Sequence, residues 1–207
     1  MDAALLAIRL TACPVCRGQV EPTAAQCAAC GTELSPYREQ VARATSLLAE
    51  GYNAVSRGDG RAANELALRA LMETPLAAVQ AEELQIRALL LEHDYTRAWE
   101  RTQALPADLP VRTELLEEIA ALHELEAKGK QHFNLALASA RAGLWVDASF
   151  HCERALDLAP HLEAAWRLAV KVELKRGRYE VARMRLLEGQ RRFPREPFLA
   201  QLARDLA

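Results

Sequence analysis

The sequence predicts an all-α protein, a solenoid of helical hairpins preceded by a small, cysteine-rich β-type module. Two observations carry this prediction: a residue pattern that recurs after 34 residues, and two Cys-x-x-Cys motifs near the N-terminus. The recurring positions are Gly143, Ala148, Cys152, Ala155 and Pro160, followed by Gly177, Ala182, Leu186, Gly189 and Pro194.

An earlier copy of the pattern reads Gly58, Ala63, Ala67, Ala70 and Pro75. Glycine is scarce, with nine in the chain, and three of them occupy the same position of the pattern. A glycine there can adopt positive φ and end a helix. The small residue after it lets the next helix pack closely, and the proline cannot continue that helix. Each copy is therefore predicted to be a helix–turn–helix hairpin.

A 34-residue period with this punctuation resembles the tetratricopeptide repeat (TPR) family. Positions typical of the family are occupied by Trp166, Leu135, Gly51 and Ala136. The departures are Val170 at a small-residue position, and Ser139, Glu173 and Ala54 at the usual tyrosine. The resemblance implies an array of hairpins whose first helices line a groove. The other interpretation is an irregular, alanine-rich helical bundle.

The segment 1–36 contains four of the five cysteines, Cys13, Cys16, Cys27 and Cys30. Two Cys-x-x-Cys pairs supply four thiolates, enough for a closed tetrahedral zinc site. The segment resembles a short zinc ribbon of the rubredoxin-knuckle kind, and structural Zn²⁺ is the predicted cofactor. Tetrahedral iron, disulfides and redox chemistry are the alternatives. A closed site cannot activate water, which disfavours hydrolytic catalysis.

The remainder, 37–207, is predicted to be helical. The expected elements are a first hairpin at 36–57 and 61–73, a degenerate second hairpin at 78–111 turning at His93-Asp94, a third and a fourth hairpin up to Glu196, and a capping helix at 197–206. The segment around 111–128 does not fit the period. It is interpreted as an extra helix, or as an extension of the third hairpin's first helix through Gly129.

Composition and motifs exclude several classes of protein. Hydrophobic residues make up 51% and charged residues 26% of the chain, and the net charge is −2. This is an ordinary soluble composition. No apolar run approaches the roughly 20 residues of a membrane span, and the first ten residues lack signal-peptide features, so a cytoplasmic location is predicted. Nucleotide-binding and acyl-transfer motifs are absent, and no enzymatic activity is expected.

The remaining candidate residues receive structural interpretations. Cys152 stands at an apolar packing position and is expected to be a buried small hydrophobe. The five histidines show no metal-ligand spacing and are interpreted as surface or partly buried polar residues. Residues 165–195 hold ten Lys or Arg against three Glu, which makes this end locally basic.

These features predict a non-enzymatic scaffold that binds a partner segment in the TPR-like groove. By the family's register, the groove residues are Leu48, Tyr52, Lys130, Phe133, Leu137, Arg141, Arg167, Lys171 and Lys175. An apolar-to-basic groove favours a protein or peptide with an acidic and partly apolar segment. The alternative is a nucleic-acid-associated regulator that uses the zinc ribbon and the basic C-terminal helices, although the ribbon lacks a basic face.

Overall fold

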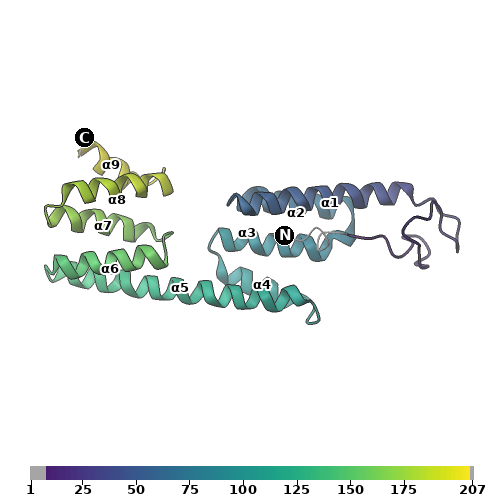
Figure 1. Cartoon of the computed structure of the whole chain (residues 1–207), viewed down its shortest axis with the longest axis horizontal. Helices are drawn as coiled ribbons and strands as arrows, with labels where there is room; N and C mark the ends of the chain where they lie inside the picture. Colours follow the sequence, from purple (N-terminus) through teal and green to yellow (C-terminus); the bar gives the residue numbers. More distant parts are fainter. Residues whose placement is uncertain (1–7, 206–207) are drawn as a thin grey trace. The chain divides into compact units, whose positions relative to one another are not determined.

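The computed structural model describes residues 8–205, with the side chains of residues 8–202, and is helical along most of that range (Figure 1). The elements are α1 (Ser35–Ser56), α2 (Gly60–Glu73), the short 3-10 helix η2 (Pro75–Ala77), α3 (Ala78–Leu91), α4 (Tyr95–Ala104), α5 (Pro110–Arg141), α6 (Trp145–Leu158), α7 (Glu163–Lys175), α8 (Tyr179–Arg192) and α9 (Pro197–Asp205). The expected last residue of the capping helix, Leu206, lies outside the described residues.

The chain divides into two compact units, the first ending at Ile119 and the second beginning at Ala120. The first unit combines the cysteine segment with α1–α4 and the start of α5. The second contains the remainder of α5 and α6–α9. The long helix α5 therefore contributes one part to each unit, and each unit is described by itself.

The turns between paired helices lie where the sequence predicts them. Gly58, Gly143 and Gly177 have φ values of 77°, 76° and 73°, and His93 takes the same left-handed conformation with φ 59°. At each turn the following amide donates to a carbonyl five residues earlier, at 2.9–3.0 Å. This is the bond of a Schellman motif, which satisfies a carbonyl at the end of the helix. The four helix–turn–helix connections predicted from sequence are therefore confirmed.

In the first unit, small side chains allow the helices to approach closely. Helix α1 packs on α2, α2 on α3, and α3 on α4. The pattern residues Ala63, Ala67 and Ala70 of α2 are fully buried. Asp59 and Asp94 cap α2 and α4, because each carboxylate accepts a hydrogen bond from the amide three residues later.

The second unit repeats this arrangement from α6 to α9. Helix α6 packs on α7, α7 on α8, and α8 on α9. The pattern residues Ala148 and Ala182 are fully buried. Trp166 is 3% exposed and its indole N–H donates to the Pro160 carbonyl at 2.8 Å. Leu135, at the leucine position of the pattern, is instead 43% exposed.

Cys152 lies in the core of the second unit, as the sequence predicts. Its side chain is 2% exposed and packs within the same cluster as Ala148 and Trp166. Burial, reinforced by the nearby Glu173 carboxylate, raises the pKa of Cys152 to about 12. The thiol is therefore protonated at neutral pH and serves as an apolar packing group.

The segment 111–128 is not a separate helix, because α5 is continuous from Pro110 to Arg141. Gly129 does not interrupt α5. A Cβ at this position would lie 2.6 Å from the Ala159 Cβ, so glycine is needed for the close approach of these two segments. Leu115 and Ile119 are buried, whereas Leu125 is exposed. Of the two interpretations left open by the sequence, the structure shows the second: the segment extends the first helix of the third hairpin through Gly129.

Across residues 8–205, no helix is both long enough and apolar enough to cross a membrane. The longest helices, α1 and α5, carry charged side chains along their length.

The buried alanines of the second unit provide a test of the packing. Replacing Ala148 or Ala182 by Leu should lower the free energy of unfolding by about 1–3 kcal/mol, because the added methyl groups have no space between the helices. Chemical denaturation followed by circular dichroism would measure the change. Ala142 is exposed at the start of the α5–α6 turn, so Ala142→Leu is the matched control and should change little. Equal tolerance at all three sites would contradict close packing.

Candidate metal centre and partner-binding residues

The two Cys-x-x-Cys motifs form two turns of the same geometry, 14 residues apart. In the first, the Arg17 amide donates to the Cys13 carbonyl at 2.8 Å, and in the second the Gly31 amide donates to the Cys27 carbonyl at 2.8 Å. Arg17 and Gly31 both have positive φ, at 61° and 71°. Gly31 adopts this conformation without steric cost, whereas Arg17 adopts it despite its Cβ.

Each turn is closed by a single antiparallel bridge, Ala12 with Gln19 and Gln26 with Glu33. No strand is assigned in the segment 8–34. The expectation of a β-type module is therefore met only by these isolated bridges. The physical reason is length, because each turn leaves too few residues on either side to extend a ladder before the chain changes direction.

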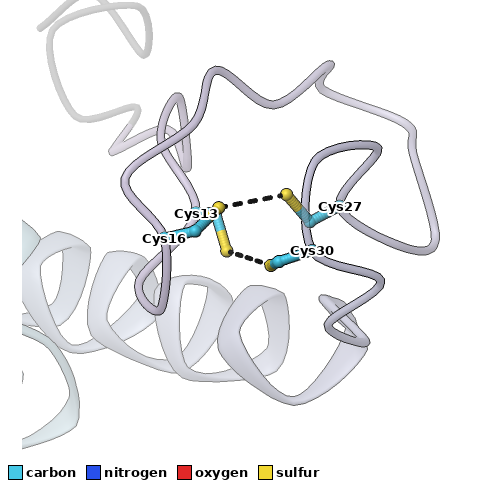
Figure 2. A group of neighbouring side chains, drawn as sticks. All are labelled: Cys13, Cys16, Cys27 and Cys30. Atoms are coloured by element: carbon cyan, nitrogen blue, oxygen red, sulfur yellow. Dashed lines mark hydrogen bonds between the residues drawn. The ribbon is translucent and has the colours of Figure 1, made fainter.

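The four cysteine sulfurs face a common point between the two turns (Figure 2). The Cys13 and Cys30 sulfurs are 3.7 Å apart, the Cys16 and Cys27 sulfurs 3.6 Å, and all four lie within 4.8 Å of one another. A tetrahedral ion with metal–sulfur bonds of about 2.3 Å requires sulfurs about 3.8 Å apart. A disulfide requires about 2.05 Å. All four cysteines are free thiols, so the arrangement can hold a metal ion.

A small apolar cluster supports the sulfurs. Cys13 and Cys27 are 1% and 3% exposed, and they pack with Val20 and Leu34. Cys16 and Cys30 are exposed. Because Leu34 immediately precedes α1, the helix start anchors the second turn. The cluster is too small to order about 30 residues alone, so metal ligation would supply much of the stability of this segment.

Backbone and hydroxyl donors surround the sulfurs. The Thr32 hydroxyl lies 3.1 Å from the Cys30 sulfur. This hydrogen bond, followed by those of the Thr32 amide and of Cys16, lowers the pKa of Cys30 to about 6. The Cys16 amide lowers the pKa of Cys13 in the same way. The Gly18 amide acts similarly on Cys16, but the neighbouring sulfurs of Cys30 and Cys27 together raise the pKa of Cys16 to about 12.

These opposing shifts have one electrostatic cause. Donors aimed at the sulfurs favour thiolates, whereas four thiolates within a few ångströms repel one another. A cation at the centre removes that repulsion and permits all four to ionise. Over residues 8–205, this is the one group of three or more Cys, His, Asp or Glu side chains whose ligand atoms converge in this way.

The sequence gives no match to known protein families or to curated proteins. The interpretation of the chain therefore depends on its own repeat pattern and its own side-chain geometry.

In the first unit, the structure buries two of the expected partner-binding residues. Leu48 is fully buried and Tyr52 is 5% exposed, both within the core formed by α1, α2 and α3. Burial, then the Glu83 carboxylate of α3, raises the pKa of Tyr52. Partner binding through these two residues would require exposed side chains. They pack inside the unit because α3 lies against α1 as well as α2.

In the second unit, six of the expected residues line two hollows that share Leu168 and Lys171. The first hollow, of about 220 Å³, is lined by Phe133, Leu137, Ala164, Arg167, Leu168, Lys171 and Phe198. The second, of about 570 Å³, is lined by Ala140, Arg141, Trp145, Leu168, Lys171, Val172, Leu174 and Lys175. We call these two hollows together the α5–α7 groove. Lys130 does not line it and instead pairs with Glu126 at 2.8 Å.

The cations of the α5–α7 groove differ in their availability. Arg167 is held by Glu163 at 3.6 Å and by the buried Glu196 at 3.5 Å. Arg141, Lys171 and Lys175 are exposed, and no carboxylate of the described residues lies within 4 Å of them. Arg167 therefore has a structural role beside α9, whereas the other three can accept an anionic partner.

Sequence reasoning missed the contributions of Phe198, Leu168 and Trp145 to this groove. The Lys171 ammonium lies 4.4 Å from the centroid of the Phe198 ring, a cation–π contact between α7 and α9. The signal in the sequence was the amphipathic pattern of the capping helix. This pattern predicts that Phe198 packs inward, but it does not show which residues Phe198 contacts.

The hydroxyl beside Cys30 generates a test of the metal centre. Thr32→Val should raise the pKa of Cys30 from about 6 toward that of an ordinary thiol, because the hydrogen bond that lowers it is lost. At neutral pH the metal-free variant would contain less thiolate, and metal affinity should fall by roughly 10- to 100-fold. Ultraviolet thiolate absorbance against pH and chelator competition would measure both. Thr23→Val, in the same segment but outside both turns, is the control. Unchanged values in Thr32→Val would contradict the assigned hydrogen bond.

Proposed function

We propose that this protein is a non-enzymatic adaptor that binds an acidic, partly apolar segment of another protein in the α5–α7 groove. One observation carries the proposal: three exposed cations, Arg141, Lys171 and Lys175, have no carboxylate of the described residues within 4 Å and border a concave surface with an apolar lining. Anchors buried in apolar hollows supply most of the affinity of such interfaces, and charges set orientation and association rate.

We assign the helical part to the TPR-like repeats on the basis of its internal period. The left-handed turn at Gly143, its Schellman bond and the buried Ala148 recur 34 residues later at Gly177 and Ala182, and this repetition supports the assignment. In such arrays the first helices of the hairpins face the groove, and α5 and α7 are the first helices here. The TPR fold serves many processes, so it does not identify the partner.

We propose Zn²⁺ as the ion of the cysteine centre and a structural role for it. Four converging thiolates suit tetrahedral Zn²⁺, and tetrahedral Fe is the alternative with the same ligands. Cys13, Cys16, Cys27 and Cys30 would hold the ion, which would neutralise their charge and order the segment. Four protein ligands leave no position for water or substrate. Free, closely spaced thiols also suit a reducing compartment such as the cytoplasm.

Metal removal tests this role. The purified protein should contain about one zinc ion per chain by elemental analysis. Cys27→Ser should release the ion and unfold the segment before α1, while the helical circular dichroism signal stays nearly unchanged, because α1–α9 have their own cores. Cys152→Ser is the control and should retain the zinc. Visible thiolate-to-iron absorption in the native protein would instead indicate iron. Full metal retention after all four ligands are replaced would overturn the assignment.

Charge reversal tests the α5–α7 groove. Changing Arg141, Lys171 and Lys175 together to Glu should abolish capture of the native partner in pull-downs from host lysate, because carboxylates would face carboxylates. Arg167 is left unchanged, since it holds Glu196 at the start of α9. The matched control reverses three cations that are exposed on α8, Arg183, Arg191 and Arg192.

The two variants give opposite outcomes for the two faces. Loss of capture with the groove variant alone supports the groove. If the α8 variant loses capture and the groove variant does not, the opposite face is the binding surface and the proposal fails. Phe133→Ala should weaken capture without changing the charge, which separates the apolar anchor from general electrostatic attraction.

The nucleic-acid alternative rests on the basic residues of the C-terminal helices. Several are neutralised locally. Arg185 forms a salt bridge with Glu153 at 3.4 Å, and Glu188 forms salt bridges with both Arg191 and Arg192. This pairing favours the protein partner. Binding to DNA or RNA that weakens steeply with salt would favour the alternative, since phosphate contacts release counterions.

A further inference from the structure

Two histidines from neighbouring helices form a side-chain pair in the second unit. His132 lies on α5 and His151 on α6, and their Nδ1 atoms are 3.1 Å apart. The ring centroids are 5.3 Å apart with 32° between the planes, and the Phe150 ring meets the His151 ring edge-on at 5.2 Å. Both histidines are partly exposed. The pair lies outside the cysteine centre and does not line the α5–α7 groove.

We propose that His132 and His151 form a second metal site, a two-imidazole chelate for a divalent transition-metal ion such as Cu²⁺ or Ni²⁺. Imidazole nitrogens bind such ions at about 2.0–2.1 Å. With the two Nδ1 atoms 3.1 Å apart, an ion at that distance from both subtends an angle of about 100°. This lies between the right angle of square-planar coordination and the wider tetrahedral angle, so both geometries are within reach of small ring movements.

The protonation of the pair is compatible with metal binding at neutral pH. Burial, then His151 and the Arg154 guanidinium, lowers the pKa of His132, so this ring is neutral. In a neutral pair one Nδ1 carries the hydrogen of the mutual hydrogen bond and the other accepts it. An ion bound to both Nδ1 atoms takes the place of that hydrogen. The ring that donated it then carries its proton on Nε2 instead of Nδ1. Binding therefore relocates one proton within a ring, whereas protonation at lower pH competes with the ion.

The helices fix the two ligands before any ion arrives. His132 and His151 belong to paired helices joined by the left-handed turn at Gly143 and packed through Ala136 and Ala148. Within the described part of the chain, no third Cys, His, Asp or Glu converges on the pair. Water would therefore complete the coordination, which makes the site open and exchangeable, unlike the four-cysteine centre. Arg154 disfavours a cation nearby and should weaken the site.

Calorimetric titration of Ni²⁺ into the zinc-loaded full chain tests the proposal. One Ni²⁺ site per chain is expected, weakened at least tenfold by His132→Ala or His151→Ala. The control is His123→Ala, which removes an exposed histidine of the same helix α5 and should bind Ni²⁺ as the original chain does. Affinity should be higher for Cu²⁺ than for Ni²⁺, following the order of divalent ions. It should fall as the pH is lowered, because protons compete with the ion for the ring nitrogens, and Arg154→Gln should strengthen binding.

A second measurement keeps the test independent of variant folding. In proton NMR spectra of the original chain, Cu²⁺, which is paramagnetic in either geometry, should broaden the ring signals of His132 and His151 before those of His93, His123 and His161. Equal Ni²⁺ affinity in both alanine variants would overturn the proposal. So would thiolate-to-nickel absorption, which would place the ion at the cysteines, or broadening that spares both rings.

Discussion

The close approach of paired helices, made possible by small side chains, is the constraint on which the rest of the structure depends. Ala63, Ala148 and Ala182 have no exposed surface, and Gly129 lies so close to Ala159 that a Cβ could not be accommodated without movement. Helices at such separations contact each other along their length, and dispersion summed over many atoms stabilises them. The left-handed turns hold each pair antiparallel, so the groove and the histidine pair both arise from this packing.

The cysteine segment is stabilised by different physics. Its apolar cluster consists of a few side chains, which cannot offset the chain entropy of the segment. Ligation of a metal ion by the four thiolates would supply the missing free energy, because the unfolded segment has no preformed site. The helical units have extensive cores and do not need the ion. The two parts of the protein therefore fold under separate constraints, one set by sulfur electrostatics and the other by apolar burial.

Most of the helix boundaries and all four interhelical turns could be predicted from the sequence. The turns depend on residues that tolerate positive φ. Glycine has this property, and it stands at three of the turns, Gly58, Gly143 and Gly177. His93 could be placed because the pattern around it survives. The sequence left the continuity of α5 open, because a glycine such as Gly129 can end a helix. In the structure, Gly129 instead lies at a close contact between two segments. Whether a glycine ends a helix or serves packing depends on what lies opposite, which no local pattern contains.

The sequence by itself determined the features that are local in the chain: the helices, their turns and the four cysteines. Their physical basis is backbone conformation and short-range spacing, which neighbouring residues specify. Only the tertiary structure decided which side chains are available. It buries Leu48 and Tyr52, brings Phe198 to Lys171, and places His132 beside His151. Each of these outcomes depends on contacts outside the repeat pattern, many of them between segments distant in the chain, and such contacts form only when the helices pack.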